Sequence, residues 1–100
     1  MRISTSSSGD STTLRIHSTR LDAAIAHELR TGLGAAIIAT SGPTVVDLSE
    51  VAFMDSSGLG ALVGAFKAID PRRLTITGVA PALRTVFRLT RIDRAFSIVE

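Results

Sequence analysis

The chain has 100 residues, of which 45% are hydrophobic, and this size and composition predict one compact domain. The absence of cysteine excludes a disulfide framework, a thiolate metal site and a thiol nucleophile. The formal net charge of +2 is too small to indicate a nucleic-acid partner, and no run approaches the ~20 apolar residues that span a bilayer. A polar stretch follows Met1-Arg2-Ile3, so we expect a cytoplasmic protein without a membrane partner.

The first part of the chain predicts a pair of strands. We expect a short edge strand at Arg2–Thr5, a turn at Ser6–Ser11 and a second strand at Thr12–His17, where apolar and polar residues alternate. A flexible N-terminus over residues 1–11 is the alternative. Asp22 then opens a predicted helix whose buried residues recur at i+4 spacing: Ile25, Leu29 and Leu33.

The middle of the chain predicts a buried strand that passes into a helix. Val45, Val46 and Leu48 form a short apolar run, and a helical pattern starts at Leu59. The tetrapeptide Asp55-Ser56-Ser57-Gly58 therefore lies at a helix N-terminus. Asp and Ser are preferred there because their oxygens accept hydrogen bonds from unpaired first-turn N–H groups, which also favour an added anion such as phosphate.

The last third repeats the alternation of strand and helix. Asp70-Pro71 ends the previous helix, Leu74 and Ile76 alternate as in a strand, Pro81 begins a helix, and Ile98-Val99 form a last strand. This order predicts an α/β fold with a mainly parallel mixed sheet of four to five strands and helices packed on it. The apolar runs at Val45 and Leu74 should then be buried.

Small residues line one face of the helix that follows Asp55. They lie opposite Leu62 and Phe66 and are Gly60, Ala61, Gly64, Ala65 and Ala68. Such a face permits close approach of another backbone, either that of a protein partner or that of a neighbouring helix in the same domain. Composition alone does not separate the two.

The residues do not predict an enzyme. His17 and His27 lie in no recognisable catalytic context, no G-x-S-x-G or phosphate-loop motif is present, and we expect neither a metal nor a cofactor. Asp47 ends a buried strand like the phospho-accepting aspartate of a receiver domain, but the acidic pair that would hold magnesium is missing. A series of arginines follows the helix starting at Pro81, namely Arg84, Arg88, Arg91 and Arg94. Without interleaved Tyr or Trp, they indicate a solvated helix face rather than nucleic-acid binding.

The segment DLSEVAFMDSSGLG, from Asp47 to Gly60, resembles the signature of the STAS domain of bacterial anti-sigma-factor antagonists. LRIHSTRLDAA, RRLTITGVAPALRTVF and LTRIDRAFSIV resemble further parts of this family in the expected order. The resemblance implies a single STAS domain over residues 1–100 that lacks the C-terminal helix of longer members. It also implies that Ser57 accepts a phosphate, with Ser56 as the alternative. Many members carry Gly-Glu where this chain has Thr19-Arg20, so partner choice is expected to differ.

By this resemblance, the unmodified protein binds an anti-sigma factor that is also a serine kinase with an ATP-binding fold, and phosphorylation releases it. A metal-dependent serine phosphatase reverses the modification, and the protein is a monomer or a weak dimer. The implied partner-binding residues are Asp22, Asp55, Ser56, Ser57, Gly58, Leu59, Gly60, Gly64 and Lys67. Two alternatives stay open: a STAS subunit of a lipid-transport ABC complex, and a partner-switching regulator of a non-transcriptional target.

Overall fold

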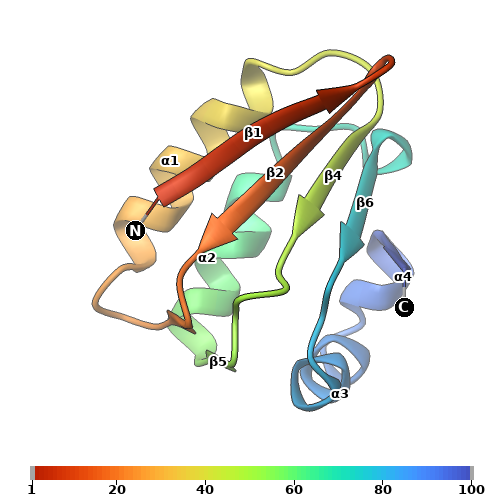
Figure 1. Ribbon diagram of the computed structural model, residues 1–100. Coiled ribbons are helices and arrows are strands. Elements are labelled where there is room, and N and C mark those ends of the chain that lie inside the picture. Colours follow the sequence, from red (N-terminus) through yellow and green to blue (C-terminus); the bar gives the residue numbers. More distant parts are fainter. Residues whose placement is uncertain (1, 100) are drawn as a thin grey trace.

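A five-stranded mixed sheet forms one layer of the molecule in the computed structural model, which describes residues 2–99 (Figure 1). The strand order is β1-β2-β4-β6-β7, with β1 antiparallel to β2 and the other neighbours parallel. The strands are β1 (Arg2–Ser8), β2 (Ser11–His17), β4 (Thr44–Asp47), β6 (Leu74–Thr77) and β7 (Ser97–Val99). The predicted fold class is confirmed.

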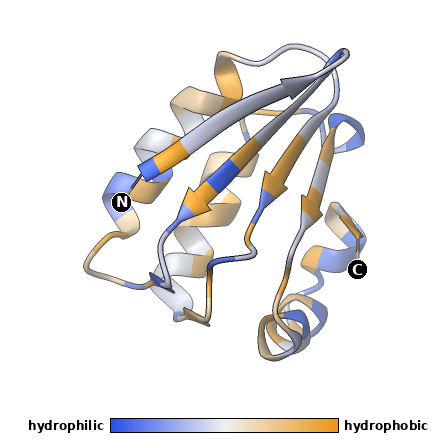
Figure 2. Ribbon diagram, viewed as in Figure 1, coloured by the Kyte–Doolittle hydropathy of each residue, from blue (hydrophilic) through white to orange (hydrophobic). Residues whose placement is uncertain are grey.

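Helices α1 and α2 lie side by side behind the sheet (Figure 1). Hydrophobic residues of the strands and of these helices fill the space between the two layers (Figure 2). Across the sheet, Leu14, Val46 and Ile76 pair in register, and all three side chains are fully buried. The helices are α1 (Ala26–Ile38), α2 (Ser56–Phe66), the 3-10 helix η1 (Pro71–Arg73), α3 (Pro81–Leu89) and α4 (Ile92–Ala95).

Burial along β4 differs from the expectation of a fully buried run. Val46 and Asp47 are buried, whereas Val45 is only half-buried, and Thr75 beside it on β6 is half-buried as well. Alternating burial of this kind indicates a sheet with one face covered more completely than the other. Leu74 is buried as predicted.

Helix α1 begins four residues later than predicted. Asp22 does not open it, because the Asp22 side chain accepts a hydrogen bond from the N–H of Ala24 at 3.1 Å and its carbonyl accepts from the N–H of Ile25 at 3.1 Å. These bonds hold a turn, and the helix starts at Ala26. Leu29 and Leu33 are buried as predicted.

A second, two-stranded sheet was not predicted from the sequence. Strand β3 (Arg20–Leu21) pairs in parallel with β5 (Phe53–Met54). The pairing brings the turn before α1 beside the start of α2. It therefore builds the surroundings of the two serines.

The two ends of the chain also differ in detail from the prediction. Strand β1 extends to Ser8 instead of ending at Thr5, and the turn is the short Gly9-Asp10, in which Gly9 has a φ of 62°. Helix α4 precedes β7 and was not predicted. Phe96, just before β7, packs edge-on against Phe66 of α2 with ring centroids 5.1 Å apart, which attaches this end to the core.

Candidate functional site

Asp55 fixes the start of α2, as its sequence position predicts. Its backbone is extended, and one carboxylate oxygen accepts a hydrogen bond from the N–H of Gly58 at 2.8 Å. The other oxygen accepts from the N–H of Ala23 at 3.2 Å. Asp55 thus joins the first turn of α2 to the turn that precedes α1.

Gly58 lies where the backbones of α2 and β3 meet. It is buried, and a methyl group at this position would overlap the carbonyl group of Leu21. The same carbonyl accepts a hydrogen bond from the N–H of Asp55 at 3.1 Å. Gly58 therefore contributes the close contact between α2 and β3 that lies beneath the two serines.

Ser56 and Ser57 are the first and second residues of α2, and both are exposed. Ser56 is the nearer of the two to the helix start. Within residues 2–99, neither hydroxyl has a hydrogen-bond partner. Ser57 lines an open groove of about 380 Å³ between α1 and α2, and Ser56 does not line it. The two serines are adjacent in sequence, but only Ser57 faces the groove.

The small-residue face of α2 is only partly open. Ala61 and Ala65 are 6% and 2% exposed, so at these two positions the alternative of packing within the domain holds. They belong to the core, on the helix that packs beside α1. Gly60 is exposed, and Gly64 is half-buried against the side chain of Arg30. These two glycines remain predicted docking positions.

The other predicted partner residues lie at different distances from Ser57. Leu59 is half-buried in the first turn of α2. Lys67 is exposed at the C-terminal end of the helix, ten residues from Ser57, which corresponds to roughly 15 Å along the axis. Asp22 is half-buried in the turn before α1. A partner that touches all of them would have to cover the length of α2.

An exposed cation beside the start of α2 is the feature that sequence analysis missed. The Arg20 guanidinium stacks over the ring of Phe53 at 4.3 Å and donates to the Asp22 carboxylate at 3.3 Å. Phe53 is 41% exposed, which is unusual for a large apolar side chain on a strand. Where many members of the resembled family carry Gly-Glu, this chain has Thr19-Arg20, and Arg20 is therefore a stacked arginine at the rim of the site. The apolar character of Phe53 was visible in the sequence, but its pairing with β3 was not.

His17 has closer partners than the sequence suggested. Its Nε2 lies 2.8 Å from the Ser4 hydroxyl, and its Nδ1 lies 2.7 Å from the Glu50 carboxylate. Serine, histidine and carboxylate thus follow one another in the order of a hydrolase triad, but on strands and a loop rather than at a strand-to-helix turn. These bonds attach the edge strand β1 to the loop after β4.

Asp47 is held in an ion pair. Arg15 donates to it at 2.9 and 3.0 Å, and the N–H of Ser49 donates at 2.8 Å. Burial alone would raise the pKa of Asp47, but the hydrogen bonds from Ser49 and the charge of Arg15 outweigh it and hold the pKa below 3.8. In the described part of the chain, no cluster of three His, Cys, Asp or Glu residues could hold a metal ion. Asp47 is thus a structural partner of Arg15.

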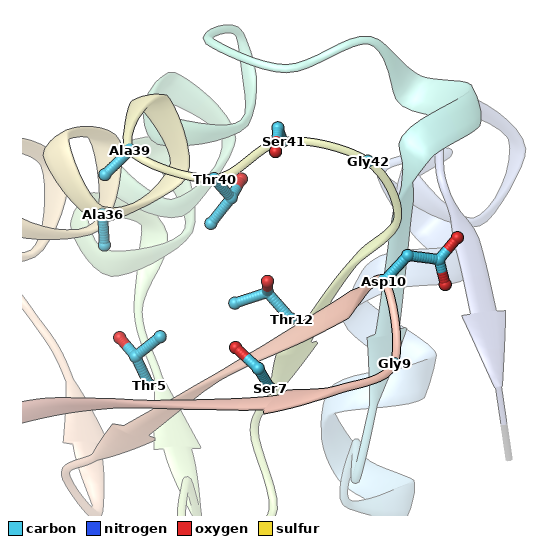
Figure 3. Close-up of a pocket in the computed structure, with 10 residues that line it drawn as sticks. All are labelled: Thr5, Ser7, Gly9, Asp10, Thr12, Ala36, Ala39, Thr40, Ser41 and Gly42. Carbon is cyan, nitrogen blue, oxygen red and sulfur yellow. The ribbon is translucent and has the colours of Figure 1, made fainter.

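A larger hollow of about 510 Å³ lies at the opposite end of the sheet, between the β1–β2 hairpin and the end of α1 (Figure 3). Thr5, Ser7 and Thr12 point into it, whereas the Asp10 carboxylate points away. Among residues 2–99, no Lys or Arg lines this hollow. It offers no cation to a phosphate group and contains none of the predicted site residues.

The family profile described as "Mlab, STAS domain" matches residues 3–100. The chain belongs to this STAS domain family. An anti-sigma-B factor antagonist of Listeria monocytogenes serovar 1/2a is 40% identical over 55 residues, which cover 53% of the present STAS domain and 48% of the relative. The alignment thus spans about half the length of that relative.

Solved structures of anti-sigma-factor antagonists share the fold. One from Mycobacterium paratuberculosis superposes on the STAS domain with a TM-score of 0.81 at 23% identity, over 97% of this chain and 83% of the other. The phosphorylated Bacillus cell fate determinant SpoIIAA gives a TM-score of 0.65 at 18% identity, over 99% and 92%. Among the described residues, no helix is long and apolar enough to cross a membrane.

Proposed function

We propose that this STAS domain is an anti-sigma-factor antagonist whose binding is controlled by phosphorylation of Ser57. The observation that supports the proposal best is the position of Ser57. Its hydroxyl is exposed, is not hydrogen-bonded within residues 2–99, and lies in the groove beside the predicted docking positions. A kinase can reach such a hydroxyl without unfolding the helix.

The partner in this proposal is an anti-sigma factor that is also a serine kinase with an ATP-binding fold. The oxygen of Ser57 attacks the γ-phosphorus of ATP and gives up its proton to a base of the kinase, the bond to the β-phosphate oxygen breaks, and ADP leaves. A metal-dependent serine phosphatase later returns the hydroxyl and releases inorganic phosphate. Both reactions take place in the cytoplasm, and both catalytic sites belong to the partners.

Local electrostatics explain why phosphorylation would release the domain from the anti-sigma factor. A phosphate adds roughly −1.5 to −2 charges and three acceptor oxygens. The N–H groups at the start of α2 tolerate this charge, whereas a close and desolvated interface does not. The proposed interface surrounds the groove and comprises Asp22, Asp55, Ser56, Ser57, Leu59, Gly60, Gly64 and Lys67, with Gly58 beneath it.

The experiment begins with the Ser57→Ala variant as bait in extracts of the source cell. The proposal requires that the captured protein contain an ATP-binding domain and transfer one phosphate to the wild-type chain. Ser57→Ala should abolish the transfer, and Ser56→Ala should preserve it. Tandem mass spectrometry that places the phosphate on Ser56 would refute the assignment.

The same capture separates the remaining alternatives. Stable co-purification with a transporter ATPase, unaffected by phosphate on Ser57, would instead identify a subunit of a lipid-transport complex. Capture of a kinase that holds no sigma factor would move the switch to a non-transcriptional target. Membership of the STAS family is compatible with each of these results.

A further inference from the structure

The groove that contains Ser57 has an arginine on its opposite wall. Ala26, His27 and Arg30 of α1 form one side, and Ser57, Gly60 and Ala61 of α2 form the other. His27 and Arg30 are three residues apart on α1, as are Ser57 and Gly60 on α2, so each pair lies on one helix face. The two faces enclose the groove.

Arg30 is exposed and, among the described residues, has neither a hydrogen bond nor an ion pair. Its guanidinium lies against Gly64, where an added methyl group would come within 2.9 Å of Nε and 3.2 Å of Cζ. A methyl group at Gly60 would meet nothing within 4 Å. The space beside Gly60, in the same groove as Arg30, is therefore open.

Ser57 lines the same groove as the Arg30 side chain. Arg30 lines the groove together with Gly60 and Ala61, and Ser57 and Gly64 are each about one helical turn from that pair, about 5 Å in opposite directions. A movement of the guanidinium from Gly64 toward Ser57 would be a rotation about the side-chain bonds of Arg30.

We propose that a phosphate on Ser57 draws the Arg30 guanidinium off Gly64 and is held by it within the α1–α2 groove. The inference rests on the proposed phosphorylation of Ser57. Arginine binds phosphate through two parallel N–H donors, and no other partner competes for its charge among the described residues. The Asp55 carboxylate at the start of α2 accepts hydrogen bonds from the N–H groups of Ala23 and Gly58.

Movement of Arg30 gives phosphorylation a second effect. In the unmodified protein the guanidinium covers Gly64, one of the predicted docking positions. After the movement, this surface loses its positive charge, and the mouth of the groove is closed by an arginine-phosphate pair. The modification thus changes the docking surface at Gly64, about two helical turns from the residue that carries the phosphate.

The test uses protein with phosphoserine incorporated at position 57 during translation, so that no kinase is required. We follow the second ionisation of the phosphate by ³¹P NMR. The pH midpoint of this ionisation should be lower in the otherwise wild-type protein than in Arg30→Gln, because the guanidinium favours the more negative phosphate. The difference should be roughly half a pH unit to one pH unit, because solvent screens an exposed pair. Arg30→Lys should fall between them. Arg88→Gln removes an exposed arginine from α3 and should leave the midpoint unchanged.

Removal of the phosphate by a broad-specificity phosphatase gives a second measurement. Arg30→Gln should be dephosphorylated several-fold faster than the wild type, because the guanidinium no longer shields the phosphate. Equal midpoints and equal rates in wild type and Arg30→Gln would overturn the inference, as would equal changes in Arg30→Gln and Arg88→Gln. Equal affinity of phosphorylated and unmodified protein for the captured anti-sigma factor would instead refute the proposed function, and would leave the NMR result standing.

Discussion

Gly58→Ala tests whether the start of α2 depends on direct contact between backbones. The added methyl group would overlap the carbonyl of Leu21 and approach its Cβ to 3.0 Å. None of these atoms belongs to the flexible end of a side chain, so α2 and β3 must separate.

The expected loss is the sum of three effects. Overpacking costs about 1–3 kcal/mol, and weakening of the Asp55 to Leu21 hydrogen bond costs about 1 kcal/mol more. Alanine regains about 1 kcal/mol through its higher helix propensity. We therefore expect Gly58→Ala to lower the free energy of unfolding by about 1–3 kcal/mol.

Urea denaturation followed by circular dichroism measures the change, and Gly60→Ala is the matched control. Gly60 lies in the same helix, two residues further on, but has open space around it, so alanine should stabilise the domain by about 0.5–1 kcal/mol. Opposite signs in the two variants would support the contact. Equal stability of Gly58→Ala and Gly60→Ala would refute it.

Three further predictions concern charge and chemistry. Ser57→Asp should melt within a few degrees of the wild type, because the first turn of α2 favours an anion by roughly 0.3–1 kcal/mol; a large loss in a thermal melt would contradict the exposed position of Ser57. Asp47→Asn should cost about 1–2 kcal/mol at neutral pH in urea melts. Because folding lowers the pKa of Asp47 below 3.8, its contribution is complete above that value and is lost as the pH falls through the folded value, so the two proteins should converge in acid. His17→Ala should leave the slow hydrolysis of an activated ester unchanged; a loss of activity would assign chemistry to the Ser4, His17 and Glu50 chain.

Local signals in the sequence were sufficient to predict the start of α2. Asp55 is a capping residue, and the helical pattern that follows needs no distant partner to be visible. The start of α1 was missed because Asp22 has the same capping chemistry but bonds to the turn that follows it. The capping preference alone does not distinguish these two outcomes.

Features that depend on distant contacts were not predictable. Strands β3 and β5 have two residues each, and only their mutual pairing defines them. Periodicity identified the small face of α2, but it could not show that Ala61 and Ala65 are buried while Gly60 is exposed. For the same reason, nothing in the sequence placed Arg30 beside Ser57 or Arg20 over Phe53.

The two carboxylate oxygens of Asp55 have a consequence for how related domains can diverge. Each oxygen accepts a hydrogen bond from a backbone N–H. The connection between α2 and the turn before α1 therefore does not depend on which side chains surround Asp55. Arg20 and Phe53 at the rim can therefore be exchanged without loss of the helix start. We expect chains with different partners to keep Asp55 and Gly58 and to vary at the rim, so that recognition evolves on an unchanged support.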